Sequence, residues 1–104
     1  ESWLADNGDI AERFLAAVSK GYQFADSNPE EAADMLLAAS PESSEDLIKA
    51  GQEWMAGQYQ DDAPYWGYQD ETIWQDFADW LYERGLLEEE FDGAAAFTNE
   101  YLPQ

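Results

Sequence analysis

The chain has 104 residues, of which 45% are hydrophobic, and it contains five Trp, six Tyr and five Phe. This length allows one domain at most, and the apolar content is sufficient for a folded core. Asp and Glu number 24 against four Lys and Arg, a formal net charge of −20, so no nucleic-acid ligand is expected, because phosphate binding requires a basic surface.

The sequence contains neither Cys nor His. Their absence excludes disulfides, the usual zinc sites, and Ser–His or Cys–His nucleophile pairs within these residues. Adjacent carboxylates such as Asp61 and Asp62 are better explained as solvated acids than as an acid–base pair, since neighbours in sequence need not share a cleft. We therefore expect no enzyme: no catalytic residue, no metal and no cofactor.

The acidic residues are spread along every segment and are not gathered in one tail. Three interpretations remain open: adaptation of the surface to high salt, mimicry of nucleic acid to capture a basic partner, and an ordinary solvated surface. Adaptation to salt is favoured, because at molar salt the Debye length falls to about 3 Å and the repulsion between carboxylates is screened.

Two helices are predicted in the first 40 residues. The first spans about residues 8–25, where apolar side chains recur at helical spacing: Ile10, Phe14, Val18, Tyr22 and Ala25. Asn28-Pro29-Glu30-Glu31 then provides an N-cap, a proline at the first helical position and early carboxylates. This second helix should end at Ser40 before Pro41 and bury Ala32, Met35, Leu36 and Ala39.

Two further helices follow. Ser43 or Ser44 should cap the third, whose apolar stripe is Leu47, Ile48, Gly51, Trp54, Met55 and Tyr59. The fourth should run from Asp70 or Glu71 to Arg84, with Gly85 as a left-handed cap. Its inner face comprises Trp74, Phe77, Ala78 and Leu81, with Trp80 on the flank. We expect Trp54, Trp74 and Trp80 in the core.

The loop from Gln60 to Gln69 interrupts the helical period with clustered aromatic residues. Tyr65, Trp66 and Tyr68 are suited to stack on a flat heteroaromatic ring, and Gly67 would permit close approach of the backbone. These four are the candidate ligand-binding residues. The alternative, that the loop aromatics are buried anchors, is the more common use of aromatic residues.

After Gly85 comes a tail in which Glu88, Glu89 and Glu90 should be solvated and Asn99 should hydrogen-bond its own backbone. Its predicted anchors are Phe91, Phe97, Tyr101 and Leu102. No segment alternates as a strand does. The sequence therefore predicts an all-α chain of about four helices plus a folded-back tail.

The order of these signals resembles one family. The stretches that carry the resemblance are Phe14-Leu15-Ala16-Ala17 with Lys20-Gly21-Tyr22, Asn28-Pro29-Glu30-Glu31-Ala32-Ala33, Gln58-Tyr59-Gln60-Asp61-Asp62-Ala63-Pro64 with Trp66-Gly67, Trp74 and Trp80, and the ending Ala96-Phe97-Thr98-Asn99-Glu100-Tyr101-Leu102-Pro103. They resemble the C-terminal region of solute-binding proteins of ABC importers, of the kind related to thiamine pyrimidine synthesis and transport.

The resemblance implies that residues 1–104 form a single C-terminal helical segment of a two-lobe α/β periplasmic-binding-protein fold. It implies an extracytoplasmic protein that binds a hydroxymethylpyrimidine or formylaminopyrimidine and delivers it to an ABC permease and its ATPase. Membrane association would come only from the permease or from an anchor upstream of Glu1. Two alternatives remain: a binder of nitrate or sulfonates, as in more distant relatives, and a stand-alone acidic helical interaction module.

Overall fold

The computed structural model describes residues 2–104, and no strand occurs within them. Its helices are α1 (Ser2–Ser27), α2 (Pro29–Ala39), α3 (Glu45–Met55), α4 (Glu71–Glu83) and a short 3-10 helix, η1 (Gly93–Ala96). The prediction of an all-α chain with four helices and a tail is confirmed, although η1 was not foreseen. No helix in this range is long and apolar enough to cross a membrane.

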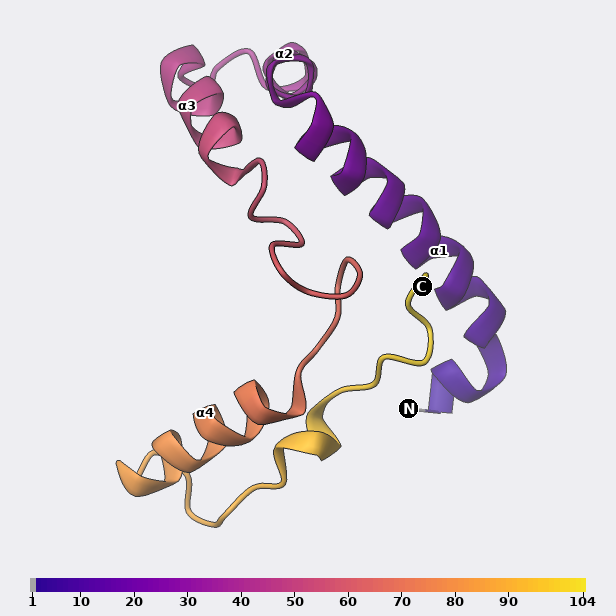
Figure 1. The fold of residues 1–104 in the computed structure, drawn as a ribbon, viewed down its shortest axis with the longest axis vertical. Helices are drawn as coiled ribbons and strands as arrows, with labels where there is room; N and C mark the ends of the chain where they lie inside the picture. Colours follow the sequence, from indigo (N-terminus) through magenta and orange to yellow (C-terminus); the bar gives the residue numbers. More distant parts are fainter. Residues whose placement is uncertain (1) are drawn as a thin grey trace.

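The helices form an open arc (Figure 1). α1 makes one long side, α2 and α3 pack on each other at one end, and α4 with η1 lies at the other. The tail after η1 returns to α1, so that the C-terminus lies beside that helix. The Cα radius of gyration is 17.5 Å, against about 13 Å for a compact domain of this length. The chain is therefore much more open than a self-contained globule.

Three predicted helix ends are confirmed, whereas α3 ends at Met55 and not near Tyr59. The Ser44 hydroxyl accepts from the Leu47 N–H at 3.5 Å and the Asp70 carboxylate from the Thr72 N–H at 2.8 Å. At the end of α4, Gly85 has φ +67°. The Leu86 N–H donates to the Leu81 carbonyl at 3.0 Å, the bond that defines a Schellman cap.

Two helix starts differ in detail from the prediction. α1 begins at Ser2 and not near residue 8. A short helical piece precedes the predicted helix and is joined to it across a kink at Asn7, where φ is −134° and ψ is 28°. Pro29 is the first residue of α2 as expected, but the Asn28 side chain does not cap it. Instead Asn28 Nδ2 donates to the Phe24 carbonyl of α1 at 3.0 Å, which ties the two helices together.

The core is small. Ala33 and Ala78 are the only buried hydrophobic residues among residues 2–104. Several residues predicted to face inward are exposed, and for them the prediction is wrong: Met35, Leu36, Ala39, Leu47, Trp54, Phe77 and Trp80. Helical periodicity identifies an apolar face but not the element that covers it, and this arc does not cover these faces.

The same correction applies to α1 and α4. Ile10 and Phe14 are exposed, Phe14 by 65%, although they belong to the predicted inner stripe. On α4 the packed face is the one that carries Ala78 and Trp74, whose ring stacks on Phe97 with centroids 5.8 Å apart. Trp74 still keeps 36% of its surface exposed, so none of the three tryptophans expected in the core is buried.

Candidate functional site

The predicted ligand-binding loop lies between α3 and α4 and is attached to α1. Trp66 stacks on Tyr22 of α1, with ring centroids 5.0 Å apart and an angle of 27° between planes. Tyr22 in turn meets the edge of Tyr59, also at 5.0 Å. One face of the Trp66 ring is therefore occupied by the chain's own Tyr22.

Hydrogen bonds fix the start of this loop to α1. The Tyr59 hydroxyl donates to Gln52 Oε1 at 3.1 Å, and Gln52 Nε2 donates to the Ala25 carbonyl at 3.4 Å. The Gly57 N–H donates to the Asp26 carboxylate at 2.5 Å. α3 and the loop that follows it are thus connected to the C-terminal end of α1 by polar contacts as well as by the aromatic rings.

Residues 65–68 form a turn. The Tyr68 N–H donates to the Tyr65 carbonyl at 3.3 Å, and Gly67, the third residue, has φ +83°, a conformation that favours glycine. The Tyr65 and Tyr68 rings meet edge to face at 5.4 Å. A Cβ on Gly67 would lie 2.9 Å from Leu102 Cδ2, so the close approach at this glycine is made by the tail.

Asn99 holds the end of the loop. Its amide Nδ2 donates to the Gln69 carbonyl and its Oδ1 accepts from the Gln69 N–H, both at 2.9 Å. Gln69 Oε1 also accepts from Trp74 Nε1 at 3.0 Å. Asn99 does tie down the tail, but it bonds the backbone of Gln69 and not its own, which corrects the sequence-based expectation.

The four predicted site residues lie in one turn, where Tyr65, Trp66 and Gly67 are half-buried and Tyr68 is exposed. A cavity of about 40 Å³ is lined by Tyr22, Gln23, Asp26, Tyr59, Gln60 and Trp66. Ligand pockets usually measure about 300 Å³ or more. In this structure Trp66 serves as a loop anchor, and ligand contact by Tyr65, Trp66, Gly67 and Tyr68 stays a prediction.

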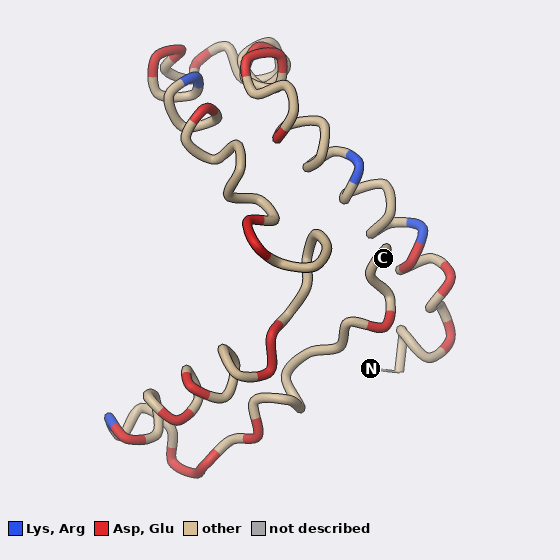
Figure 2. Tube along the Cα trace, in the orientation of Figure 1, with Lys and Arg blue, Asp and Glu red and all other residues tan. Residues whose placement is uncertain are grey.

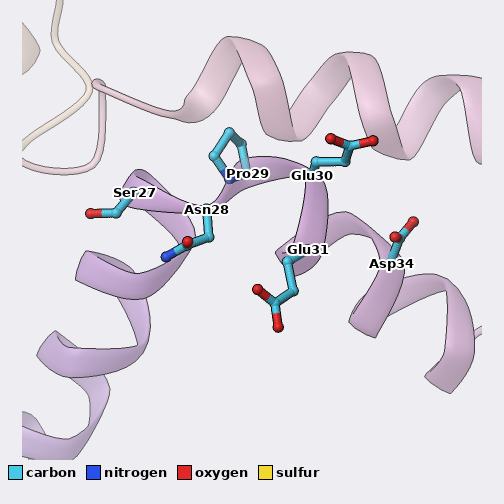
Figure 3. Close-up of a pocket in the computed structure, with 6 residues that line it drawn as sticks. All are labelled: Ser27, Asn28, Pro29, Glu30, Glu31 and Asp34. Carbon is cyan, nitrogen blue, oxygen red and sulfur yellow. The ribbon is translucent and has the colours of Figure 1, made fainter.

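A larger hollow of about 480 Å³ lies at the start of α2 (Figure 3). Its lining residues are Ser27, Asn28, Pro29, Glu30, Glu31 and Asp34. Figure 3 shows Glu30 and Asp34 turned toward the neighbouring helix and Glu31 turned away from it. Three carboxylates make this hollow unfavourable for an anion, and residues 2–104 contain no group of acids placed to hold a metal ion.

Lys49 of α3 faces these acids. Its Nζ lies 2.9 Å from Glu45 and 3.7 Å from Asp34 of α2. The hydrogen bond from Lys49 lowers the pKa of Glu45. The same contact, with added attraction from Asp34 and Glu30, raises the pKa of Lys49. Lys49 thus links α3 to α2 in a part of the chain that is otherwise strongly acidic.

The chain is similar, nearly end to end, to proteins that bind small solutes. It is 27% identical over 113 residues to the riboflavin-binding protein RibY of Chloroflexus aurantiacus, an alignment that covers 99% of this chain and 31% of that protein. It is also 27% identical over 104 residues to the formylaminopyrimidine-binding protein of Halalkalibacterium halodurans, covering 95% of this chain and 31% of the relative. No family model matches the chain.

These similarities confirm the resemblance to solute-binding proteins that the motifs indicated. Both relatives are named for what they bind and not as enzymes, in agreement with the expectation that the chain is not an enzyme. The chain spans about a third of the length of these curated relatives, 31% in each case. The two alignments therefore compare this helical chain with only part of each protein.

Proposed function

We propose that the chain is a segment of an extracytoplasmic solute-binding protein that captures a small planar solute with a pyrimidine-type ring. A thiamine pyrimidine precursor is the foremost candidate. The observation that carries the proposal is the similarity over 99% and 95% of the chain to binding proteins named for riboflavin and for a formylaminopyrimidine. Both named ligands contain a pyrimidine-type ring, because the flavin ring system includes one.

The charge of the chain supports a ring of this kind over an anion. With a net charge of −20 and an acidic lining in the hollow at the start of α2, nitrate or a sulfonate would be repelled at low salt. An uncharged heterocycle meets no such repulsion. It can also stack on aromatic side chains, of which Tyr68 is exposed in the turn of residues 65–68.

The mechanism that we propose is capture by closure. The part of the protein that corresponds to the other two thirds of the relatives would contain two α/β lobes that close around the solute, and closure would create the surface recognised by the ABC permease and its ATPase. The protein would act outside the cytoplasmic membrane. It would associate with that membrane only through an upstream anchor or the permease.

A stand-alone interaction module is the second candidate. The observation in its favour is the number of large apolar side chains that residues 2–104 leave exposed, including Phe14, Leu47 and Trp54. Such faces fit either a partner protein or the rest of a longer chain. If the chain is a stand-alone module, we expect a translated polypeptide close to these 104 residues in length that does not bind heterocyclic solutes.

A thermal-shift panel tests the proposal. The complete translated polypeptide would be heated with riboflavin, formylaminopyrimidine, hydroxymethylpyrimidine, nitrate or a simple alkyl sulfonate. A ligand at 100 times its Kd stabilises the folded state by about 2.7 kcal/mol, so one of the three heterocycles should raise the unfolding midpoint by several degrees, and the two anions should not. A shift with an anion alone would contradict the proposed ligand class, and no shift with any compound would favour the interaction module.

A further inference from the structure

Only one of the chain's three asparagines is followed by glycine. Asn7 precedes Gly8, whereas Asn28 and Asn99 precede a proline and a glutamate. Asparagine is among the thermolabile residues of proteins, because the backbone nitrogen of the next residue can attack its side-chain amide carbon. Glycine offers the least obstruction to this attack, since it has no side chain. The Asn7-Gly8 pair therefore deserves comparison with the other asparagines in the fold.

The backbone at this pair departs from helical geometry. A regular helix holds φ and ψ at about −63° and −42°, whereas Asn7, at the kink in α1, has φ −134° and ψ 28°. The helical restraint on the pair is therefore interrupted. Asn7 and Gly8 are half-buried, and Asp6 and Asp9 on either side are exposed, so solvent reaches the pair. Asn7 Nδ2 donates to the Trp3 carbonyl at 2.9 Å, an exposed bond that water can replace.

The other two asparagines are protected. Pro29 has no backbone N–H, so the nitrogen that follows Asn28 cannot act as the nucleophile. Asn99 is held at both ends of its amide by the Gln69 backbone, with two hydrogen bonds of 2.9 Å. The glutamate side chain after Asn99 also obstructs the approach of the backbone nitrogen. Neither site combines a free nucleophile with a mobile side-chain amide.

Asp92 is the other residue of this chemical type that precedes a glycine, Gly93. Here the fold occupies both reacting groups. Asp92 Oδ1 accepts from the Ala94 N–H at 3.1 Å, and the Gly93 N–H donates to Gln75 Oε1 at 2.8 Å. Gly93 is also buried, and a Cβ there would lie 2.6 Å from the Gln75 backbone nitrogen. The nucleophile at this pair is therefore fixed in place against α4.

We propose that Asn7 is a site of spontaneous deamidation, through a cyclic imide formed with the backbone nitrogen of Gly8. That nitrogen loses its proton to hydroxide and forms a bond to Asn7 Cγ. The bond between Cγ and Nδ2 breaks, and the side-chain nitrogen takes up a proton from water and leaves as ammonia. Water then opens the imide. Opening at Cγ gives aspartate, and opening at the backbone carbonyl gives isoaspartate, in which the chain continues through Cγ.

Both products change the kink. A carboxylate replaces the amide between Asp6 and Asp9, in the first turns of α1, where Figure 2 shows acidic positions. It cannot donate a hydrogen bond to the Trp3 carbonyl. Isoaspartate also lengthens the backbone beside Gly8, where a Cβ would lie 2.9 Å from the Tyr101 ring. Deamidation should therefore loosen the contact between α1 and the tail.

Peptide mapping after ageing tests the proposal. The complete translated polypeptide would be incubated at mildly alkaline pH, either folded in molar salt or unfolded in urea, and then digested with trypsin. Within the 104 residues the cleavage sites are Arg13, Lys20, Lys49 and Arg84, so the three asparagines fall in three different peptides. Mass spectrometry with electron-transfer fragmentation distinguishes asparagine, aspartate and isoaspartate in each peptide.

In the folded polypeptide Asn7 should convert at least tenfold faster than Asn28 or Asn99, to a mixture of isoaspartate and aspartate, and faster as the pH rises. Asn7→Gln should remove the signal, because the imide would need a larger ring. Conversion of Asn7 only in urea, or no faster than that of Asn99, would overturn the proposal, since the fold would then protect the pair.

Aspartate without isoaspartate would overturn the proposal as well, because direct hydrolysis of the Asn7 amide needs no attack by the Gly8 nitrogen. The mapping uses no solute. Its result is therefore independent of whether the polypeptide binds a heterocycle, and a failure of the proposed function would leave the assignment of Asn7 unchanged.

Discussion

Asn99 and Gln69 exchange two hydrogen bonds of 2.9 Å, one in each direction. The Asn99 amide thereby pairs with the Gln69 backbone in the way that a neighbouring strand would. The pair connects the tail to the loop beside α4, while Leu102 and Tyr101 contact Gly67 and Gly8 farther along the tail. This single side chain therefore holds the tail against the loop that precedes α4.

Replacing Asn99 by Ala should destabilise the chain. It leaves the half-buried N–H and C=O of Gln69 without their partners, which costs about 1–3 kcal/mol. Urea unfolding at molar salt would measure the change. Asn99→Asp should lose nearly as much, because a carboxylate accepts from the N–H but faces the carbonyl without a proton to donate. An unchanged urea midpoint for both variants would show that the pair contributes nothing.

Two glycines should respond to Ala in opposite directions. A Cβ on Gly93 would lie 2.6 Å from the Gln75 backbone nitrogen, so Gly93→Ala must separate η1 from α4 and should cost about 1–3 kcal/mol. Gly21 is within α1 with open space around it, and Gly21→Ala should stabilise the isolated chain by about 0.5–1 kcal/mol. Thermal unfolding measured by circular dichroism would compare them. Equal effects would contradict the packing of η1 on α4.

Lys49→Gln should remove a contribution to stability that depends on pH. Lys49 lowers the pKa of Glu45 in the folded state below its ordinary value of 4.5, so this contribution is present above pH 4.5 and is lost as the pH falls through the lowered pKa. The pKa of Lys49 in the folded state is raised above its ordinary value of 10.5. The same contribution to stability is therefore also lost as the pH rises above 10.5 and through the raised pKa of Lys49.

The measurement is the difference in unfolding midpoint between the parent chain and Lys49→Gln at several pH values. It should be constant near neutrality and shrink at both extremes. Because all three groups are solvent-exposed, the difference should also shrink in molar salt. A difference that grows as the pH falls below 4 would contradict the assigned direction of the Glu45 shift.

Salt should stabilise the chain itself. A net charge of −20 repels across a small surface, and raising the salt from about 0.15 M to 1 M shortens the Debye length from about 8 Å to 3 Å. The unfolding midpoint should therefore rise steeply with KCl. A variant with Glu88, Glu89 and Glu90 changed to Gln should need less salt for the same midpoint. A flat response in both chains would favour an ordinary acidic surface over adaptation to salt.

The sequence was most informative about local structure. Ser44, Asp70 and Gly85 occupy the cap positions that their side-chain chemistry or conformational freedom favours, so the start of α3 and both bounds of α4 could be predicted closely. The end of α3 was not, because the helix ends at Met55 and the predicted stripe continued to Tyr59. Burial was predicted poorly, as Trp54 shows with 70% of its surface exposed. A stripe of apolar residues requires a cover, but the sequence of the stripe does not say whether the same chain supplies it.

The loop shows the same limit at the candidate site. Its aromatic cluster and the need for Gly67 could be recognised from residue types, but the stacking of Trp66 on Tyr22 joins segments far apart in sequence. No local pattern indicates such a pair. The contact of Leu102 with Gly67 and the hydrogen bond from Asn99 to Gln69 could not be predicted for the same reason. Each depends on how the tail returns across the loop.

Calorimetric titration of the complete translated polypeptide with formylaminopyrimidine would test whether this protein binds a pyrimidine-type solute. The isolated 104-residue chain and a Tyr68→Ala variant of the complete polypeptide would serve as comparisons, in molar salt. We expect saturable one-to-one binding by the complete polypeptide and none by the 104-residue chain. Absence of binding by the complete polypeptide to formylaminopyrimidine, hydroxymethylpyrimidine and riboflavin alike would contradict it.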